Sequence, residues 1–243
     1  MNKYGLIGKD VSYSYSKQHF EQKFTAEDIK ATYQNFDISD IGGVQQIFNI
    51  ETDLKGLNVT IPYKEKIIPF LDELDETAQK IGAVNTIKLL PGGKRIGYNT
   101  DAFGFIKSIF PLLRNQHTNA LVLGTGGASK AIMHCLNSLG IQGKQVSRTP
   151  EAHQCSYDQL DEKIMTSHYL IINCTPLGTA PNTGQCPDIP YKFISHKHFL
   201  FDLIYNPPIT KFLALGKQLG AQISNGQKML EFQAEQSWDI WNS

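Results

Sequence analysis

The chain has 243 residues, of which 41% are hydrophobic and 19% are charged, enough apolar material for one large domain or two modest ones. Basic and acidic residues number 23 each, so the formal net charge is zero and nothing favours nucleic acid or an anionic membrane as a partner. No segment is apolar for long enough to be a signal peptide or to span a bilayer, so we expect a cytoplasmic protein. The four cysteines lack the spacing of a disulfide scaffold or a zinc site, so we expect no metal site.

Strand-like and helical segments alternate almost throughout, which predicts an α/β protein of two domains. In the first part we expect strands at 4–8, 31–38, 57–61, 84–90 and 95–99, and helices at 16–24, 41–49 and 101–113. In the second part we expect a glycine-loop helix ending near 139, a last helix at 227–241, and buried strands at 121–123, 169–172 and 199–203. The polar stretch 114–119 interrupts the pattern and marks a junction.

Three polar segments lie close together in the first part, where apolar strands are expected to end. They read Asn58-Val-Thr-Ile-Pro-Tyr-Lys64, Gly82-Ala-Val-Asn85-Thr86 and Asn99-Thr100-Asp101. Amides and hydroxyls can bind the hydroxyl groups of a small polyol, while Lys64 and Asp101 could transfer a proton. Each segment alone has another interpretation, since Lys64 could be a surface lysine and Asp101 could cap the helix that follows. Together they favour a small-molecule site.

A glycine loop, Gly124-Thr-Gly-Gly-Ala-Ser129, follows an expected strand and precedes a helix, as dinucleotide binding requires. About twenty residues further on, where NAD enzymes place an acidic residue, the chain has Ser147-Arg148-Thr149. A guanidinium and two hydroxyls suit a 2′-phosphate, so we expect NADP as the cofactor, unless Arg148 is only a solvated surface charge.

These motifs make the chain resemble the shikimate dehydrogenase family almost from end to end. The resemblance also includes Ser14-Tyr-Ser16, Asn173-Cys-Thr-Pro-Leu-Gly178, Tyr205-Asn-Pro and Gly226-Gln-Lys-Met-Leu-Glu-Phe-Gln233. It implies a reversible reduction of 3-dehydroshikimate to shikimate with NADPH, in chorismate and aromatic amino-acid biosynthesis, by a monomer or homodimer.

The resemblance also implies a role for each matching residue. Lys64 and Asp101 would be the catalytic pair, and the substrate would be bound by Ser14, Ser16, Asn58, Thr60, Lys64, Asn85, Asp101, Tyr205 and Gln233, with Thr86 nearby. The cofactor would be bound by Gly124, Thr125, Gly126, Gly127, Ala128, Ser129, Ser147, Arg148, Thr149, Thr175 and Gly226.

Some of these residues have a structural alternative. Ser16 could instead cap the first helix, and Tyr205 could belong to a proline turn. Gln233 lies on the apolar stripe of the last helix, where its amide needs a partner, either backbone or ligand.

The expected domains are residues 1–101 for the substrate, joined by a carboxy-terminal helix at 221–243, and residues 119–220 as a Rossmann-like NADP domain. Residues 102–118 would link them. The chain departs from the family pattern at Tyr13 and Lys17, and at Pro150-Glu-Ala-His153, where a second basic residue is usual. A quinate/shikimate dehydrogenase that also uses NAD therefore stays as an alternative. A catalytically silent nucleotide sensor on the same fold is a second alternative, which the intact Lys64 and Asp101 oppose.

Overall fold

The computed structural model describes residues 1–12, 14–51 and 53–243, so Tyr13 lies outside the described residues. The chain forms two compact units, the first made of Met1–Phe103 and Gln233–Ser243 and the second of Gly104–Phe232. Each unit is built on its own six-stranded sheet, and the expected α/β class is confirmed. The functional domains expected at 1–101 with 221–243, and at 119–220, remain a prediction.

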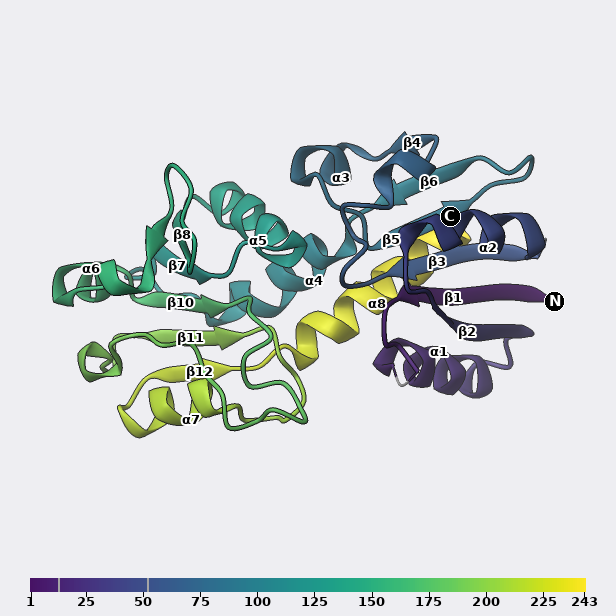
Figure 1. The fold of residues 1–243 in the computed structure, drawn as a ribbon. Coiled ribbons are helices and arrows are strands. Elements are labelled where there is room, and N and C mark those ends of the chain that lie inside the picture. The colour runs from purple at the N-terminus through teal and green to yellow at the C-terminus, as the bar shows by residue number, and fades with distance from the viewer. Residues whose placement is uncertain (13, 52) are drawn as a thin grey trace. The chain divides into compact units, whose positions relative to one another are not determined.

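The first unit has a mixed sheet with the strand order β2-β1-β3-β5-β6-β4 (Figure 1). Its strands are β1 (Asn2–Gly8), β2 (Ala31–Asp37), β3 (Leu54–Val59), β4 (Glu73–Leu74), β5 (Thr86–Leu89) and β6 (Arg95–Tyr98). Its helices are α1 (Tyr15–Ala26), α2 (Val44–Ile50), α3 (Glu76–Ile81), the start of α4 (Thr100–Ile109) and most of α8 (Gln227–Asn242), with short 3-10 turns at Ile41–Gly43 and Ile68–Phe70.

Two apolar clusters cover the two faces of this sheet. On one face α1 and α8 supply Phe20, Phe24 and Trp241, and on the other α2 and α3 supply Val44 and Ala78. Trp241 also donates its indole N–H to the carbonyl of Ile87, and a side chain at Gly56 would overlap its ring. The part of the last helix from Gln233 onward therefore belongs to the core of the first unit.

The second unit has an all-parallel sheet with the order β12-β11-β10-β7-β8-β9. Its strands are β7 (Asn119–Leu123), β8 (Gln142–Ser147), β9 (Cys155–Ser156), β10 (Leu170–Asn173), β11 (Phe199–Asp202) and β12 (Gln222–Ser224). Its complete helices are α5 (Gly127–Ser138), α6 (Glu162–Ser167) and α7 (Lys211–Gln218), with 3-10 turns at Phe110–Leu112, Tyr157–Gln159 and Tyr191–Phe193. The expected all-apolar strands β7, β10 and β11 are its buried centre.

The structure corrects three local expectations. The strand expected at 57–61 ends at Val59, and Ile61 is 69% exposed, so the alternation does not continue through Ile61. The helix expected at 101–113 begins at Thr100 and ends at Ile109, because Pro111 lacks the N–H that a continuing helix needs. At the start of α1 the capping side chain is Ser14, which accepts from the backbone N–H of Lys17, so the capping alternative for Ser16 is wrong.

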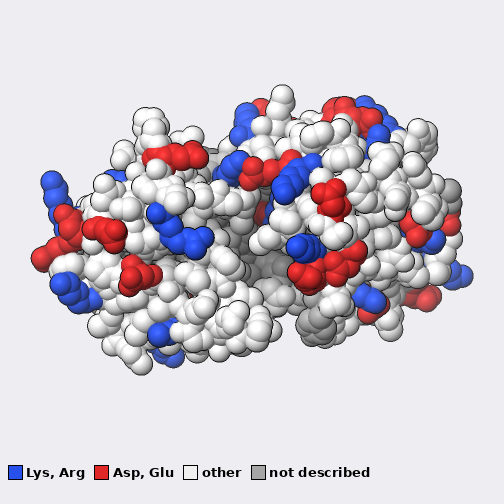
Figure 2. All heavy atoms as spheres, viewed as in Figure 1, with Lys and Arg blue, Asp and Glu red and all other residues white. Residues whose placement is uncertain are grey.

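Charged side chains of both signs are interspersed on the face shown in Figure 2. This distribution agrees with the zero net charge of the sequence. In the described part of the chain no helix has both the length and the apolar character needed to cross a membrane. Among those same residues, no group of three or more histidine, cysteine or acidic side chains could hold a metal ion.

Candidate functional site

The first sheet brings the polar segments together because β5 runs antiparallel to β3 and to β6. Asn58, near the end of β3, pairs with Thr86 at the start of β5, and Thr86 pairs in turn with Tyr98 at the end of β6. The chain then continues directly into Asn99-Thr100-Asp101. Segments that are far apart in sequence therefore meet at the same end of these three neighbouring strands.

Asn85 is the centre of this cluster and is 3% exposed. Its Nδ2 donates to Thr100 Oγ1 at 3.0 Å and to Asp101 Oδ1 at 2.9 Å, while its Oδ1 accepts from the backbone N–H of Thr100 at 2.7 Å. A buried amide needs such partners, and here they fix its orientation. Asn85 therefore holds the first turn of α4, with Asp101, against the sheet.

Lys64 and Asp101 form a close ion pair. Lys64 Nζ lies 2.7 Å from Asp101 Oδ2, and the two side chains are 16% and 9% exposed. Asp101 does not cap α4, because Asn99 Oδ1 accepts from the N–H of Ala102 at the amino end of that helix. With Oδ1 bound to Asn85 and Oδ2 bound to Lys64, the carboxylate holds a lysine that remains partly accessible. Such a pair can give and recover a proton next to a bound ketone.

Gln233 joins the same cluster from α8. It is 7% exposed, and its Oε1 lies 3.4 Å from Thr100 Oγ1 and 3.5 Å from Asn85 Nδ2. These long contacts would allow the amide to bind a ligand as well. The structure thus brings Gln233 to Asn85 and Thr100, which are more than 130 residues away in sequence.

Ser14 and Ser16 lie at the amino end of α1. Besides capping this helix, Ser14 donates its hydroxyl to Asn35 Oδ1 at 2.9 Å, while Ser16 is the second residue of the helix. Thr60 is half-buried just after β3, and its backbone N–H donates to Ile7 O. All three hydroxyls belong to the same unit as Lys64 and Asp101.

Sequence reasoning missed two buried hydroxyls, those of Tyr33 and Ser237. Tyr33 donates to Asn58 Oδ1 at 2.8 Å, and Ser237 Oγ lies 3.0 Å from Asn58 Nδ2 and 2.8 Å from Thr86 Oγ1. Ser237 comes one helical turn after Gln233, so the spacing of four residues on α8 was the signal that could have found it. Tyr33 gave no such signal, because tyrosine is an ordinary residue in a strand.

The glycine loop lies at the topological switch point of the second sheet, where strand order reverses between β7 and β10. Gly124 has φ +109°, and a side chain there would press against the backbone of Cys174 and the methyl group of Thr175. The space beside Gly126 is open, and among the described residues no side chain caps the amino end of α5. The backbone N–H groups of this helix terminus suit a pyrophosphate.

The last residue of the glycine loop and the segment that follows β8 also suit a dinucleotide. Ser129 stands where glycine or alanine is usual. Its hydroxyl donates to Gly126 O at 2.7 Å and accepts from Gln145 on β8, so both its hydrogen bonds are made within the protein. Ser147 is buried and accepts from the N–H of Thr149, whereas Arg148 is exposed on the turn after β8. An exposed guanidinium at this position fits a 2′-phosphate. The segment Ser147-Arg148-Thr149 has no acidic side chain, which would repel such a phosphate.

Thr175 follows β10, beside the glycine loop. Asn173 Oδ1 accepts from both the N–H and the hydroxyl of Thr175, at 3.0 and 2.6 Å. Gly226 donates its N–H to Ile204 O, and a side chain at Gly226 would collide with the Leu203 carbonyl, so this glycine is needed for packing. Tyr205 is half-buried in the second unit.

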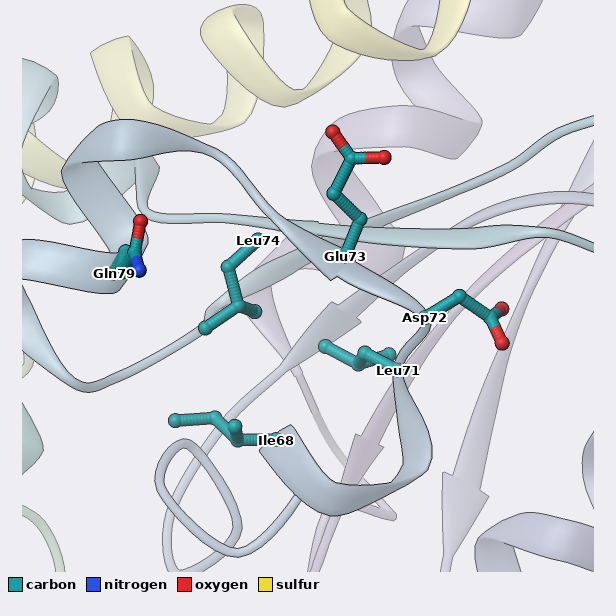
Figure 3. A pocket seen from close by; sticks show the side chains of 6 residues that line it. All are labelled: Ile68, Leu71, Asp72, Glu73, Leu74 and Gln79. Carbon is teal, nitrogen blue, oxygen red and sulfur yellow. The ribbon is translucent and has the colours of Figure 1, made fainter.

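A separate hollow of about 360 Å³ lies in the first unit (Figure 3). Its lining residues are Ile68, Leu71, Asp72, Glu73, Leu74 and Gln79. Its carboxylates are already paired, Asp72 with Arg95 and Glu73 with Lys94. None of the predicted site residues lines it, so we do not assign the chemistry to this hollow.

The fold and the two residue clusters define a nucleotide-dependent α/β dehydrogenase. A family profile described as "Shikimate dehydrogenase substrate binding domain" matches residues 6–87. A Clostridium botulinum protein named "Shikimate dehydrogenase (NADP(+))" is 37% identical to this chain, over 98% of this chain and 95% of its own length. The chain therefore belongs to the shikimate dehydrogenase family.

Solved structures agree with this assignment. A crystal structure of a shikimate dehydrogenase in complex with NADP+ is 30% identical, with a TM-score of 0.88 over 99% of this chain and 90% of that one. The Thermus thermophilus shikimate 5-dehydrogenase, solved in complex with NADP(H) and shikimate, is 26% identical, with a TM-score of 0.88 over 99% of this chain and 93% of that one.

Proposed function

We propose that this chain is an NADP-dependent shikimate dehydrogenase in which Lys64 and Asp101 carry out proton transfer. The reaction is the reversible reduction of 3-dehydroshikimate to shikimate in aromatic amino-acid biosynthesis. The observation that supports these roles most strongly is the 2.7 Å ion pair between Lys64 and Asp101 among buried amides. A catalytically silent sensor on the same fold would have no need of this pair.

In the reductive direction the ketone oxygen of the substrate gains negative charge. We propose that the Lys64 ammonium stabilises this charge and gives the oxygen a proton, while Asp101 holds the lysine in place. In the oxidative direction the same pair takes the proton from the substrate hydroxyl. Bound NADPH supplies the hydride.

The other predicted residues bind and orient the two molecules. Ser14 and Ser16 are proposed donors to the substrate carboxylate, while Asn58, Asn85 and Gln233 bind ring hydroxyls, with Thr60 and Tyr205 as further contacts. For the cofactor, the glycine loop and the amino end of α5 bind the pyrophosphate. Arg148, with Ser147 and Thr149, binds the 2′-phosphate, and Thr175 and Gly226 are further cofactor contacts.

Parallel assays of the purified protein test this function. We expect shikimate oxidation with NADP, monitored as NADPH formation, to exceed the rate with NAD and the rate with quinate. Comparable rates with quinate and NAD would support the broader quinate/shikimate alternative, which the missing second basic residue in Pro150-Glu-Ala-His153 keeps open. No oxidation of shikimate with either cofactor would contradict the proposal.

A further inference from the structure

Tyr33 lies on β2, next to the candidate substrate site. It is 3% exposed, and its ring stacks on Phe20 of α1 with centroids 4.8 Å apart and planes inclined by 15°. Its hydroxyl contacts one residue of the site. It donates to Asn58 Oδ1 at 2.8 Å.

The Tyr33 hydroxyl keeps its proton at ordinary pH. Burial raises the pKa of Tyr33 well above the usual value for a phenol. A phenol that stays neutral can donate one hydrogen bond, and Asn58 Oδ1 is the acceptor that the geometry provides.

The rest of the Asn58 side chain is held by the protein. Its Nδ2 lies 3.0 Å from Ser237 Oγ, 3.3 Å from the carbonyl oxygen of Asn85 and 3.3 Å from Thr86 Oγ1. Both protons of Nδ2 are therefore used inside the fold. The opposite amide orientation would turn Oδ1 toward the Asn85 carbonyl, which cannot donate, so the environment fixes the orientation.

One hydrogen-bonding position of Asn58 is left. An amide oxygen has two lone pairs, and among the described residues Oδ1 accepts only from Tyr33. Asn58 can therefore accept a hydrogen bond from a ligand hydroxyl but has no donor to offer it. A ligand with a carbonyl or ether oxygen at this place would set one hydrogen-bond acceptor against another, its own oxygen against Asn58 Oδ1.

We propose that Tyr33 is a positioning residue for this reaction, because its buried hydroxyl donates to Asn58 Oδ1 and fixes the Asn58 amide as an acceptor for a ring hydroxyl of the substrate. The inference rests on the proposed function and deepens it. Tyr33 does not touch the substrate in this account, and it acts through Asn58.

The test is a double-mutant cycle measured by steady-state NADPH formation from shikimate. Tyr33→Phe keeps the ring and its stacking on Phe20 and removes the hydroxyl. We expect the Michaelis constant for shikimate to rise about three- to tenfold, the usual scale for one neutral hydrogen bond, with turnover and the Michaelis constant for NADP within about twofold of wild type. In an Asn58→Ala background the same substitution should have no further effect.

Tyr4→Phe is the matched control, since Tyr4 is buried in the same sheet and pairs directly with Tyr33 in the strand register. It should leave the Michaelis constant for shikimate unchanged. The inference is overturned by an unchanged constant in Tyr33→Phe, or by an equal increase with and without Asn58. Loss of the fold in Tyr33→Phe alone, seen by circular dichroism, would show the hydroxyl to be structural and would also overturn it. An inactive wild type would instead count against the proposed function.

Discussion

At the scale of single residues, the site consists of side chains whose hydrogen bonds are mostly made inside the protein. Asn85 and Asn58 are buried and oriented by neighbouring donors and acceptors, and Asp101 has a partner on each oxygen. Such pre-organised groups need no rearrangement as the reaction proceeds. Lys64 and Arg148 differ, because Lys64 is partly accessible and Arg148 is exposed.

Arg148 should determine the cofactor preference. A charge-assisted contact with a 2′-phosphate is worth about 1.5–3 kcal/mol, or about ten- to 150-fold in affinity. Arg148→Ala should therefore raise the Michaelis constant for NADP by about that factor and leave the constant for NAD nearly unchanged. Steady-state kinetics with both cofactors measure this, and an equal loss with NAD would show that Arg148 does not bind the phosphate.

Gln233→Ala should weaken shikimate binding without unfolding α8, because alanine is the better helix former. The contacts of Gln233 Oε1 with Thr100 and Asn85 are long, so their loss removes little internal bonding. Circular dichroism and a shikimate titration separate the two effects. A variant that loses its fold but binds shikimate normally per folded molecule would identify Gln233 as a structural amide.

At the scale of elements, the strongly patterned segments could be predicted and the short ones could not. The alternating or all-apolar strands β1, β7, β10 and β11, and the hairpin of β5 and β6, follow from the sequence. The two-residue strands β4 and β9 and the six-residue helices α3 and α6 are too short to show a period. For the two helices the remaining local signal is an aspartate cap, Asp75 for α3 and Asp161 for α6.

Helix caps show why local prediction also failed at the site. Ser14 and Ser16 are both good capping residues two positions apart, and sequence alone does not decide between them. The same ambiguity applies to Asn99 and Asp101. In the structure Asn99 accepts the helical N–H, which leaves Asp101 for Lys64 and Asn85.

A hydrogen bond connects the ends of β10 and β11, from Asn173 to the buried carboxylate of Asp202. Asp202 is fully buried, and it accepts hydrogen bonds from Asn173, Thr210 and the N–H of Ile204. Burial raises the pKa of Asp202 from 3.8 to about 6, against the lowering effect of these hydrogen bonds. The folded state therefore binds a proton more readily than the unfolded state does.

The sign of the pH effect follows from this difference. Between about pH 4 and about pH 6 the folded chain holds more protons at Asp202, so this residue's contribution to the free energy of unfolding falls as pH rises, by about 3 kcal/mol at most. Asp202→Asn removes that dependence. Urea unfolding at pH 4.5 and 7.5 should show wild type gaining stability over the variant at the lower pH. The exposed Asp158→Asn serves as the control, and a difference independent of pH would contradict the assignment.

At the scale of the whole molecule, the sequence motifs predicted the α/β class, the family and NADP. The motifs consist of residues proposed to contact ligands, and such residues are recognisable in short segments. The network behind them was not predictable, because Tyr33 and Ser237 reach Asn58 only through the pairing of β2 with β1 and the packing of α8. Those contacts depend on the complete fold.

The central claim is that Lys64 is the acid and base of the reaction. Lys64→Met keeps most of the length of the side chain and removes the charge, while Ser14, Ser16 and Gln233 can still bind shikimate. The decisive measurement is NADPH formation at saturating shikimate, with the exposed neighbour Lys66→Met as control. We predict a turnover about 10²–10⁴ times lower in Lys64→Met, a much smaller change in the Michaelis constant, and a nearly normal Lys66→Met. Turnover close to wild type in Lys64→Met would contradict the account and leave Lys64 as a binding residue.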